Sequence, residues 1–176
     1  MKAILVGFMG SGKTTVGQLL ADELHTEHSD LDDLIVQHAG KSIPEIFDQD
    51  GEFAFRRMEH DVLADAMKNT QGILSTGGGT PIQESNFNLL RASDVPVILL
   101  NVKPETVLAR IGGADGRPVI KKVGIDGIAG LKAQRDPHYH SVSDVEIETD
   151  NLTPEEVVAA ICRFHQFELD DQADII

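Results

Sequence analysis

The chain has 176 residues, of which 41% are hydrophobic and 25% are charged, as is ordinary for a soluble globular domain. Its 15 basic and 29 acidic residues give a formal charge of −14, which repels polyphosphate backbones and anionic membranes, so we expect neither nucleic acid nor a membrane as a partner. The single Cys162 excludes an internal disulfide and no segment reaches the ~18 apolar residues of a membrane span, so we expect one cytoplasmic domain over residues 1–176, acting as a monomer.

The first predicted strand runs into a phosphate-binding motif. Residues 3–6 form a short apolar run, typical of a strand buried in a parallel sheet, and residues 13–24 have helical periodicity. Between them, Gly7-Phe8-Met9-Gly10-Ser11-Gly12-Lys13-Thr14 matches the pattern G-x-x-x-x-G-K-[ST]. The glycines let backbone N–H groups turn toward a phosphate, Lys13 can reach the β- and γ-phosphates, and the Thr14 hydroxyl can ligand Mg²⁺. The flanking strand and helix are the context in which this motif binds ATP.

Two acidic residues follow the first helix. Asp30 and Asp32 are expected at the end of the second strand, on one side of an extended segment beside the phosphate loop. One carboxylate could hold the metal, and the other could accept a hydrogen bond from the attacking hydroxyl. The alternative is structural, because either residue could cap a helix over residues 31–38.

The next predicted elements carry residues suited to an anionic substrate. A helix over residues 52–67 carries Arg56, and a buried strand over residues 72–75 runs into Gly77, Gly78 and Gly79, whose backbone a ligand could approach closely. Together with Arg135, later in the chain, Arg56 could clamp a carboxylate. The alternatives are a structural turn for the glycines and surface ion pairs for the arginines.

Strands and helices continue to alternate in the second half. Helices are predicted over residues 86–91, 105–110 and 155–167, and strands over residues 97–100 and 145–147. This order predicts a parallel sheet covered on both faces, with ligands at the carboxyl ends of its strands. Motor-type ATPases have a metal-binding acid at the end of such a strand, but the strand over residues 97–100 ends in Asn101. GTPases recognise the guanine base with an Asn-Lys-x-Asp motif, which this chain lacks. The sequence therefore favours neither class.

Glycines at positions 112, 113, 116, 124, 127 and 130 make this stretch the loosest part of the chain. We expect a closing lid at about residues 112–123 that brings Arg117 to the transferring phosphoryl group; the alternative is a disordered surface loop. The acidic tail at about residues 168–176 is expected to fray. Cys162, on the apolar side of the last helix, is expected to be a small core residue.

Together these residues resemble the shikimate kinase family over nearly the whole chain, from residue 3 to about residue 158. The resemblance is carried by the phosphate motif with Thr15-Val16-Gly17, and by Asp30-Leu31-Asp32, Gly40-Lys41-Ser42-Ile43, Phe55-Arg56, Gly77-Gly78-Gly79, Arg117-Pro118, and Arg135 with Pro137 and Tyr139. It implies an α/β fold of the P-loop type, three αβα layers with a five-stranded parallel sheet of order 2-3-1-4-5, similar to nucleoside monophosphate kinases.

The same resemblance implies transfer of the ATP γ-phosphate to the 3-hydroxyl of shikimate, on the route to chorismate. The cofactor implied is Mg²⁺, served by Thr14 and Asp30. Shikimate would contact Asp32, Arg56, Arg135 and the three glycines Gly77, Gly78 and Gly79. ATP would contact Gly10, Ser11, Gly12, Lys13, Thr14, Thr15, Arg117 and Arg110, the last packing on adenine. The catalytic residues would be Lys13, Asp32 as the candidate base, and Arg117.

Two other functions remain open at this point. A P-loop kinase of another small hydroxy acid, such as gluconate, would share the fold and the phosphate loop but would leave Arg56 and the three glycines unexplained. A non-catalytic ATP-binding regulator would bind ATP without releasing ADP when an acid substrate is added.

Overall fold

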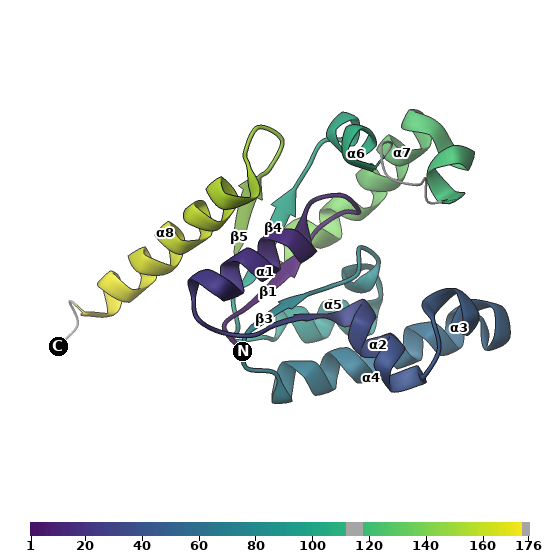
Figure 1. The fold of residues 1–176 in the computed structure, drawn as a ribbon, viewed down its shortest axis with the longest axis horizontal. Coiled ribbons are helices and arrows are strands. Elements are labelled where there is room, and N and C mark those ends of the chain that lie inside the picture. Colours follow the sequence, from purple (N-terminus) through teal and green to yellow (C-terminus); the bar gives the residue numbers. More distant parts are fainter. Residues whose placement is uncertain (112–117, 174–176) are drawn as a thin grey trace.

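Five parallel strands form one sheet, in the order β2-β3-β1-β4-β5 (Figure 1). The computed structural model describes the backbone of residues 1–111 and 118–173, and the side chains of residues 1–111 and 126–164. The strands are β1 (Ala3–Val6), β2 (His28–Asp30), β3 (Ile73–Ser75), β4 (Val97–Asn101) and β5 (Val145–Glu148). The predicted fold class and strand order are confirmed.

The central strand is buried on both faces, as its uninterrupted apolar run predicts. Ala3 and Leu5 join a core with α1 (Lys13–Glu23) and α8 (Pro154–Ala173). Ile4 and Val6 join the larger core on the other face of the sheet. The helices that contribute to this second core are α2 (Leu31–Ala39), α3 (Ile43–Gln49), α4 (Gly51–Asn69), α5 (Glu84–Arg91), α6 (Pro104–Ile111) and α7 (Pro118–Val142).

Helix α3 is absent from the sequence prediction. Ser42 and Glu45 form a capping box, in which the Glu45 N–H donates to Ser42 Oγ (3.4 Å) and the Ser42 N–H donates to Glu45 Oε2 (2.8 Å). Pro44 in the first turn has the backbone conformation that a helix start requires. The signal was therefore in the sequence, but α3 has only seven residues, so its apolar spacing at Ile43, Ile46 and Phe47 spans little more than one turn.

Helix α7 corrects the prediction of a loose segment up to Gly130. The backbone is helical from Pro118 onward, so the second part of the predicted lid belongs to α7, and residues 112–117 lie outside the described residues. Glycine costs about 1 kcal/mol in a helix interior relative to alanine. Tertiary contacts outweigh this cost, because Ile128 is buried and Lys132 donates to Asn101 Oδ1 at the end of β4 (3.1 Å).

Helix α8 begins as predicted, with a capping box in which Thr153 Oγ1 accepts from the Glu156 N–H (3.2 Å). It continues to Ala173 and so includes the first residues of the tail that the sequence predicts to fray, while residues 174–176 lie outside the described part. Cys162 is partly buried against the core that α1 and α8 share.

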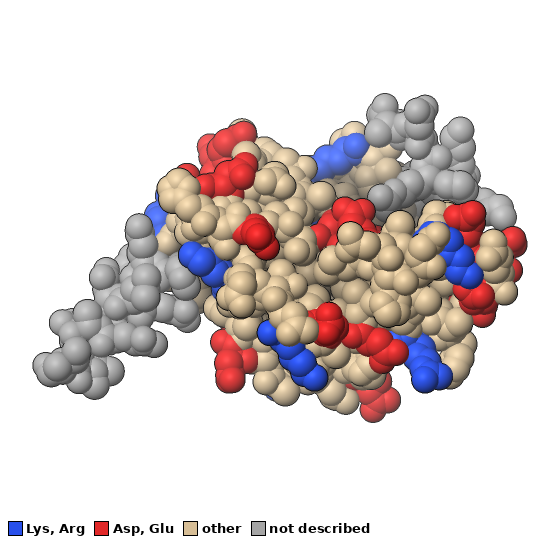
Figure 2. Space-filling view, turned by 60° about the horizontal axis from the view of Figure 1, so that its bottom comes forward, with Lys and Arg blue, Asp and Glu red and all other residues tan. Residues whose placement is uncertain are grey.

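Acidic and basic side chains are interspersed over the face drawn in Figure 2. Among residues 1–111 and 118–173, no helix combines the length and the apolar character that a membrane crossing requires. The carboxyl ends of the strands all lie at one edge of the sheet, since the strands are parallel, and this edge collects the residues described next.

Candidate active site

The loop between β1 and α1 folds around the start of α1. Gly10 (φ 72°) and Gly12 (φ 95°) have left-handed backbone conformations that favour glycine. Gly12 is the N-cap of α1 and gives no side-chain hydrogen bond to the first turn, so the N–H groups and the positive end of the helix dipole are available to an anion. Lys13 Nζ donates to the carbonyl oxygens of Gly7 (2.8 Å) and Phe8 (2.9 Å), so its ammonium group lies across the loop. This loop has the geometry of a phosphate-binding site.

A hydroxyl and a carboxylate meet beside the phosphate loop. Thr14 Oγ1 donates to Asp30 Oδ2 (2.9 Å), and Asp30 Oδ1 accepts from the Asp32 N–H (3.0 Å), which caps α2. Asp30 therefore caps α2, as the structural alternative supposes, and its other oxygen lies beside the phosphate loop, where a metal-binding role stays a prediction. No group of three His, Cys, Asp or Glu side chains in the described residues could hold a metal. Mg²⁺ prefers hard oxygen ligands and keeps water and phosphate oxygens, so this pair fits it when a nucleotide completes the shell.

Asp32 lies in the first turn of α2 and not on an extended segment, which corrects the prediction. Strand β2 ends at Asp30, and its cap turns the chain into a helix at the next residue. The Asp32 carboxylate faces the segment that follows β3, because its Oδ1 lies 3.1 Å from where a Cβ on Gly77 would be. Asp32 therefore lies between the Thr14–Asp30 pair and the triple-glycine turn, residues 77–79.

Arg56 approaches the triple-glycine turn from α4. Its Nη1 and Nη2 lie 3.1 and 3.3 Å from where a Cβ on Gly79 would be. Nη1 also donates to Oε2 of Glu59 (3.0 Å), which is only 1% exposed, and Thr80 Oγ1 donates to the other oxygen of this carboxylate (2.8 Å). Arg56 does form an ion pair, as the structural alternative supposed, but the pair is partly buried and fixes the guanidinium beside the turn.

Arg135 and Tyr139 approach the same turn from α7. The Tyr139 hydroxyl donates to the carbonyl oxygen of Gly78 (2.5 Å), and Arg135 Nη1 donates to the same oxygen at 3.5 Å. The Arg135 guanidinium also lies over the ring of Phe8, 5.8 Å from its centroid. Burial raises the pKa of Tyr139 to about 12, although the Arg135 charge favours the phenolate. One turn of α7 therefore holds the central glycine and presents a cation beside it.

The triple-glycine turn brings the anion sites together. A Cβ on Gly78 would lie 3.4 Å from the Met9 backbone nitrogen and 3.6 Å from the Gly7 carbonyl oxygen, so this turn packs against the phosphate loop. Arg56 and Arg135 reach the turn from two different helices. The structure therefore places both predicted clamp arginines beside the predicted phosphate loop.

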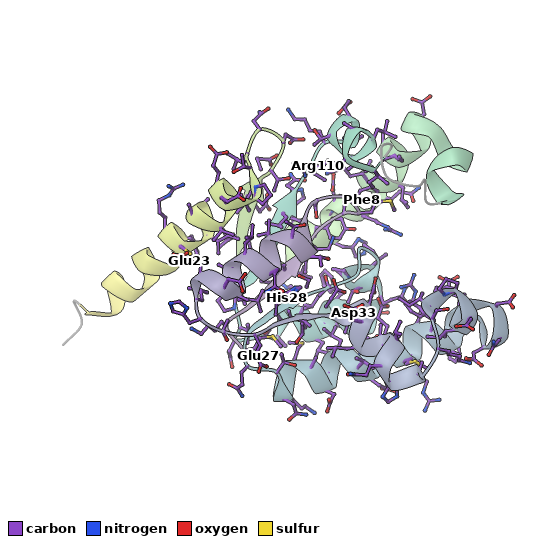
Figure 3. The ribbon with its side chains drawn as sticks, in the orientation of Figure 1. Phe8, Glu23, Glu27, His28, Asp33 and Arg110 are labelled. Carbon is purple, nitrogen blue, oxygen red and sulfur yellow. The ribbon has the colours of Figure 1, made fainter. Side chains whose placement is uncertain are left out.

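Arg110 joins the phosphate loop to the end of β5. Its Nη1 donates to Gly10 O (3.2 Å) and Thr149 Oγ1 (3.2 Å), and its Nη2 donates to Thr149 O (2.7 Å). Figure 3 shows it above the loop, near Phe8. Of the other predicted ATP contacts, Ser11 is buried in the loop, Thr15 is exposed on α1, and Arg117 lies outside the described residues.

Several partners of these residues are not predicted from the sequence. Glu59 and Thr80 are two of them, although Glu59 follows Arg56 at the helical i, i+3 spacing. His28 is another, and it contacts Ser75 Oγ through Nε2 (2.9 Å). Burial lowers the pKa of His28, an effect that Asp30 and Asp33 oppose. The Arg56–Glu59 spacing was a local signal, but no local pattern indicates the contacts of Thr80 and Ser75, which are distant in sequence from their partners.

Comparison with known proteins gives a consistent result. A family model described as shikimate kinase matches residues 9–166. The shikimate kinase of Limosilactobacillus fermentum is 45% identical over 173 residues, 98% of this chain and 100% of that protein. The shikimate kinase of Enterococcus faecalis is 39% identical over 90% of this chain and 94% of that protein.

Solved structures show the same similarity. A shikimate kinase from Acinetobacter baumannii in complex with shikimate superposes with a TM-score of 0.87, at 33% identity, over 95% of this chain and 93% of that one. A deoxyadenosine kinase from M. mycoides with bound dATP has a TM-score of 0.64 at 16% identity, over 94% of this chain and 100% of that one, and shares the fold alone.

Proposed function

The chain belongs to the shikimate kinase family, and we propose that it transfers the γ-phosphate of ATP to the 3-hydroxyl of shikimate, giving shikimate 3-phosphate and ADP. The observation that carries this proposal is the shared position of Arg56 and Arg135 at the triple-glycine turn, which itself packs against the phosphate loop. Two guanidinium groups suit a carboxylate, and the loop suits a triphosphate. Because the turn that both arginines reach packs against the loop, an acid held by the arginines would lie next to ATP.

On this proposal the reaction depends on positioning and charge neutralisation. Arg56 and Arg135 hold the carboxylate of shikimate. The 3-hydroxyl oxygen attacks the γ-phosphorus, its proton passes to the Asp32 carboxylate, and ADP leaves. Lys13 neutralises charge on the phosphoryl oxygens. Arg117, outside the described residues, would add a second cation.

The Thr14–Asp30 pair would hold Mg²⁺ through its hydroxyl and carboxylate oxygens. When bound, Mg²⁺ supplies positive charge to the phosphate oxygens and lowers the barrier to transfer. Arg110, which lies between the phosphate loop and the end of β5, would pack on the adenine of ATP. Residues at about 112–123, of which those from Pro118 onward begin α7, would form the lid. We expect the enzyme to act as a monomer in the cytoplasm, where ATP is available.

The test is ADP release in the presence of ATP, Mg²⁺ and shikimate, with three controls that each lack one component. We expect release only in the complete mixture. A panel of other hydroxy acids, including gluconate, tests the acceptor: a better rate with another acid would overturn the assignment to shikimate. Nucleotide binding without acid-stimulated release would overturn the assignment as a kinase.

A further inference from the structure

A relay of hydrogen bonds links strand β2 to the first turn of α1 through β3. His28 Nε2 lies 2.9 Å from Ser75 Oγ, and Ser75 Oγ lies 3.0 Å from the Lys13 carbonyl oxygen. Ser75 is fully buried and His28 is half-buried. Figure 3 shows His28 on the side of the sheet that α1 covers. The relay ends at Lys13, the first residue of the helix that follows the phosphate loop.

The direction of the relay follows from the number of protons available. A serine hydroxyl has one proton, and here it goes to the Lys13 carbonyl oxygen, which can only accept. Ser75 Oγ must therefore accept from His28, so the Nε2 atom of the imidazole carries the proton. Both of the oxygen atoms in the relay are then satisfied, and the side chain at position 28 acts as a donor.

Helix α1 approaches the relay so closely that only glycine fits at the contact. A Cβ on Gly17 would lie 2.5 Å from His28 Nε2 and 2.7 Å from Ser75 Oγ. Such distances are well inside van der Waals contact, so a larger residue would displace the His28 ring and the Ser75 hydroxyl or push α1 away from β2 and β3. The contact of these three elements is therefore fixed both by packing and by the two hydrogen bonds.

Helix α1 and strand β2 also meet at the Thr14–Asp30 pair, the two oxygens proposed to hold Mg²⁺. Thr14 follows Lys13 on α1, Asp30 lies two residues after His28 on β2, and the two side chains meet at 2.9 Å. The relay sets how α1 lies against β2, and this in turn sets the separation of the hydroxyl and the carboxylate. We propose that His28 is a positioning residue that holds the Thr14–Asp30 pair in the geometry that binds Mg²⁺ with nucleotide. This inference rests on the proposed function, which supplies the Mg²⁺–nucleotide complex as the ligand.

The experiment measures the affinity of the intact protein for ADP by calorimetry, with and without Mg²⁺. The variants are His28→Leu, which removes the donor, and His28→Gln, which keeps an N–H donor of similar reach. His38→Leu is the matched control, because His38 is exposed at the end of α2 and forms no hydrogen bond in the described residues. Ser75→Ala breaks the same relay with a smaller deletion and serves if His28→Leu does not fold.

We expect the gain in ADP affinity that Mg²⁺ confers to fall about tenfold in His28→Leu, because loss of the relay would let α1 shift against β2 and change the separation of Thr14 and Asp30. The metal-free affinity should change little, His28→Gln should recover most of the gain, and His38→Leu should match the wild type. The apparent KM for shikimate should stay unchanged, because Arg56 and Arg135 lie outside the relay.

Three results would overturn the positioning role: an unchanged Mg²⁺ effect in His28→Leu, an equal loss of affinity with and without Mg²⁺, or no recovery in His28→Gln. Failure of the proposed function has a different signature. In that case the wild-type protein would bind ADP in a Mg²⁺-dependent way but would release no ADP from ATP when shikimate is added.

Discussion

Tyr139 offers a direct test of how α7 holds the triple-glycine turn. It is the single tyrosine in the chain, which has no tryptophan, so the ultraviolet absorbance of tyrosinate reports the ionisation of this one side chain. Its hydroxyl is buried and donates to Gly78 O at 2.5 Å. Burial raises the pKa of Tyr139 from 10.0 to about 12. An absorbance titration of the folded protein should therefore show no ionisation near pH 10, whereas the same titration in denaturant should show it there.

The size of the effect follows from this pKa difference. A rise of the pKa from 10.0 to about 12 corresponds to about 3 kcal/mol of free energy. Because the folded state holds the proton more tightly than the unfolded state, this contribution is fully present below pH 10. It is lost as the pH rises from 10 to 12, so the free energy of unfolding should fall in that window.

The Tyr139→Phe variant supplies the control. It lacks the titrating group, so its free energy of unfolding should not show the decrease between pH 10 and 12 that the ionisation of Tyr139 causes. Below pH 10 it should be less stable than the wild type by about 1–3 kcal/mol, because the Gly78 carbonyl loses its short hydrogen bond. Urea unfolding at several pH values measures both effects. Ionisation near pH 10 in the folded wild type, or equal stability of the two proteins below pH 10, would refute the reasoning.

Three further predictions concern single side chains. Asp32→Asn should fold normally but lose turnover by a factor of roughly 10²–10⁴, since the amide cannot accept the proton. A coupled assay of ADP release measures the turnover, and a wild-type rate would remove Asp32 from the mechanism. Arg135→Ala should weaken shikimate binding roughly ten- to a hundredfold in calorimetry, because a charge-assisted contact is lost; unchanged affinity would refute the clamp. Burial raises the pKa of the Cys162 thiol, so disulfide reagents should label it more slowly in the folded protein than in denaturant; equal rates would contradict its burial.

The elements that the sequence predicts well are those that carry a local signal. The strand at residues 3–6 is an apolar run followed by a glycine-rich motif, and α8 begins with a cap that can be recognised from Thr153 and Glu156. Helix α3 lacks a long periodic face, and α7 contains glycines that oppose a helix. In α7 the burial of Ile128 outweighs local propensity, and this burial depends on contacts distant in sequence.

The candidate site was also predicted in part. The residue types and their order along the chain predict Lys13, Arg56 and Arg135 as site residues. The sequence does not predict most of their partners, because contacts such as that between Tyr139 and Gly78 join residues that only the fold brings together. The spacing of Asp32 from Asp30 predicts an extended segment, but the cap at Asp30 starts a helix instead.

The triple-glycine turn limits how this enzyme could be redesigned for other acceptors. A methyl group at Gly77 would press on the Asp32 carboxylate and one at Gly79 on the Arg56 guanidinium, whereas one at Gly78 would fill the space against the phosphate-loop backbone. Substitutions at residues 77 and 79 would therefore displace side chains that are proposed to bind the acceptor. Changes in acceptor range are better sought in the side chains of the surrounding helices. These can be exchanged without altering the backbone turn that lies between the two arginines and the phosphate loop.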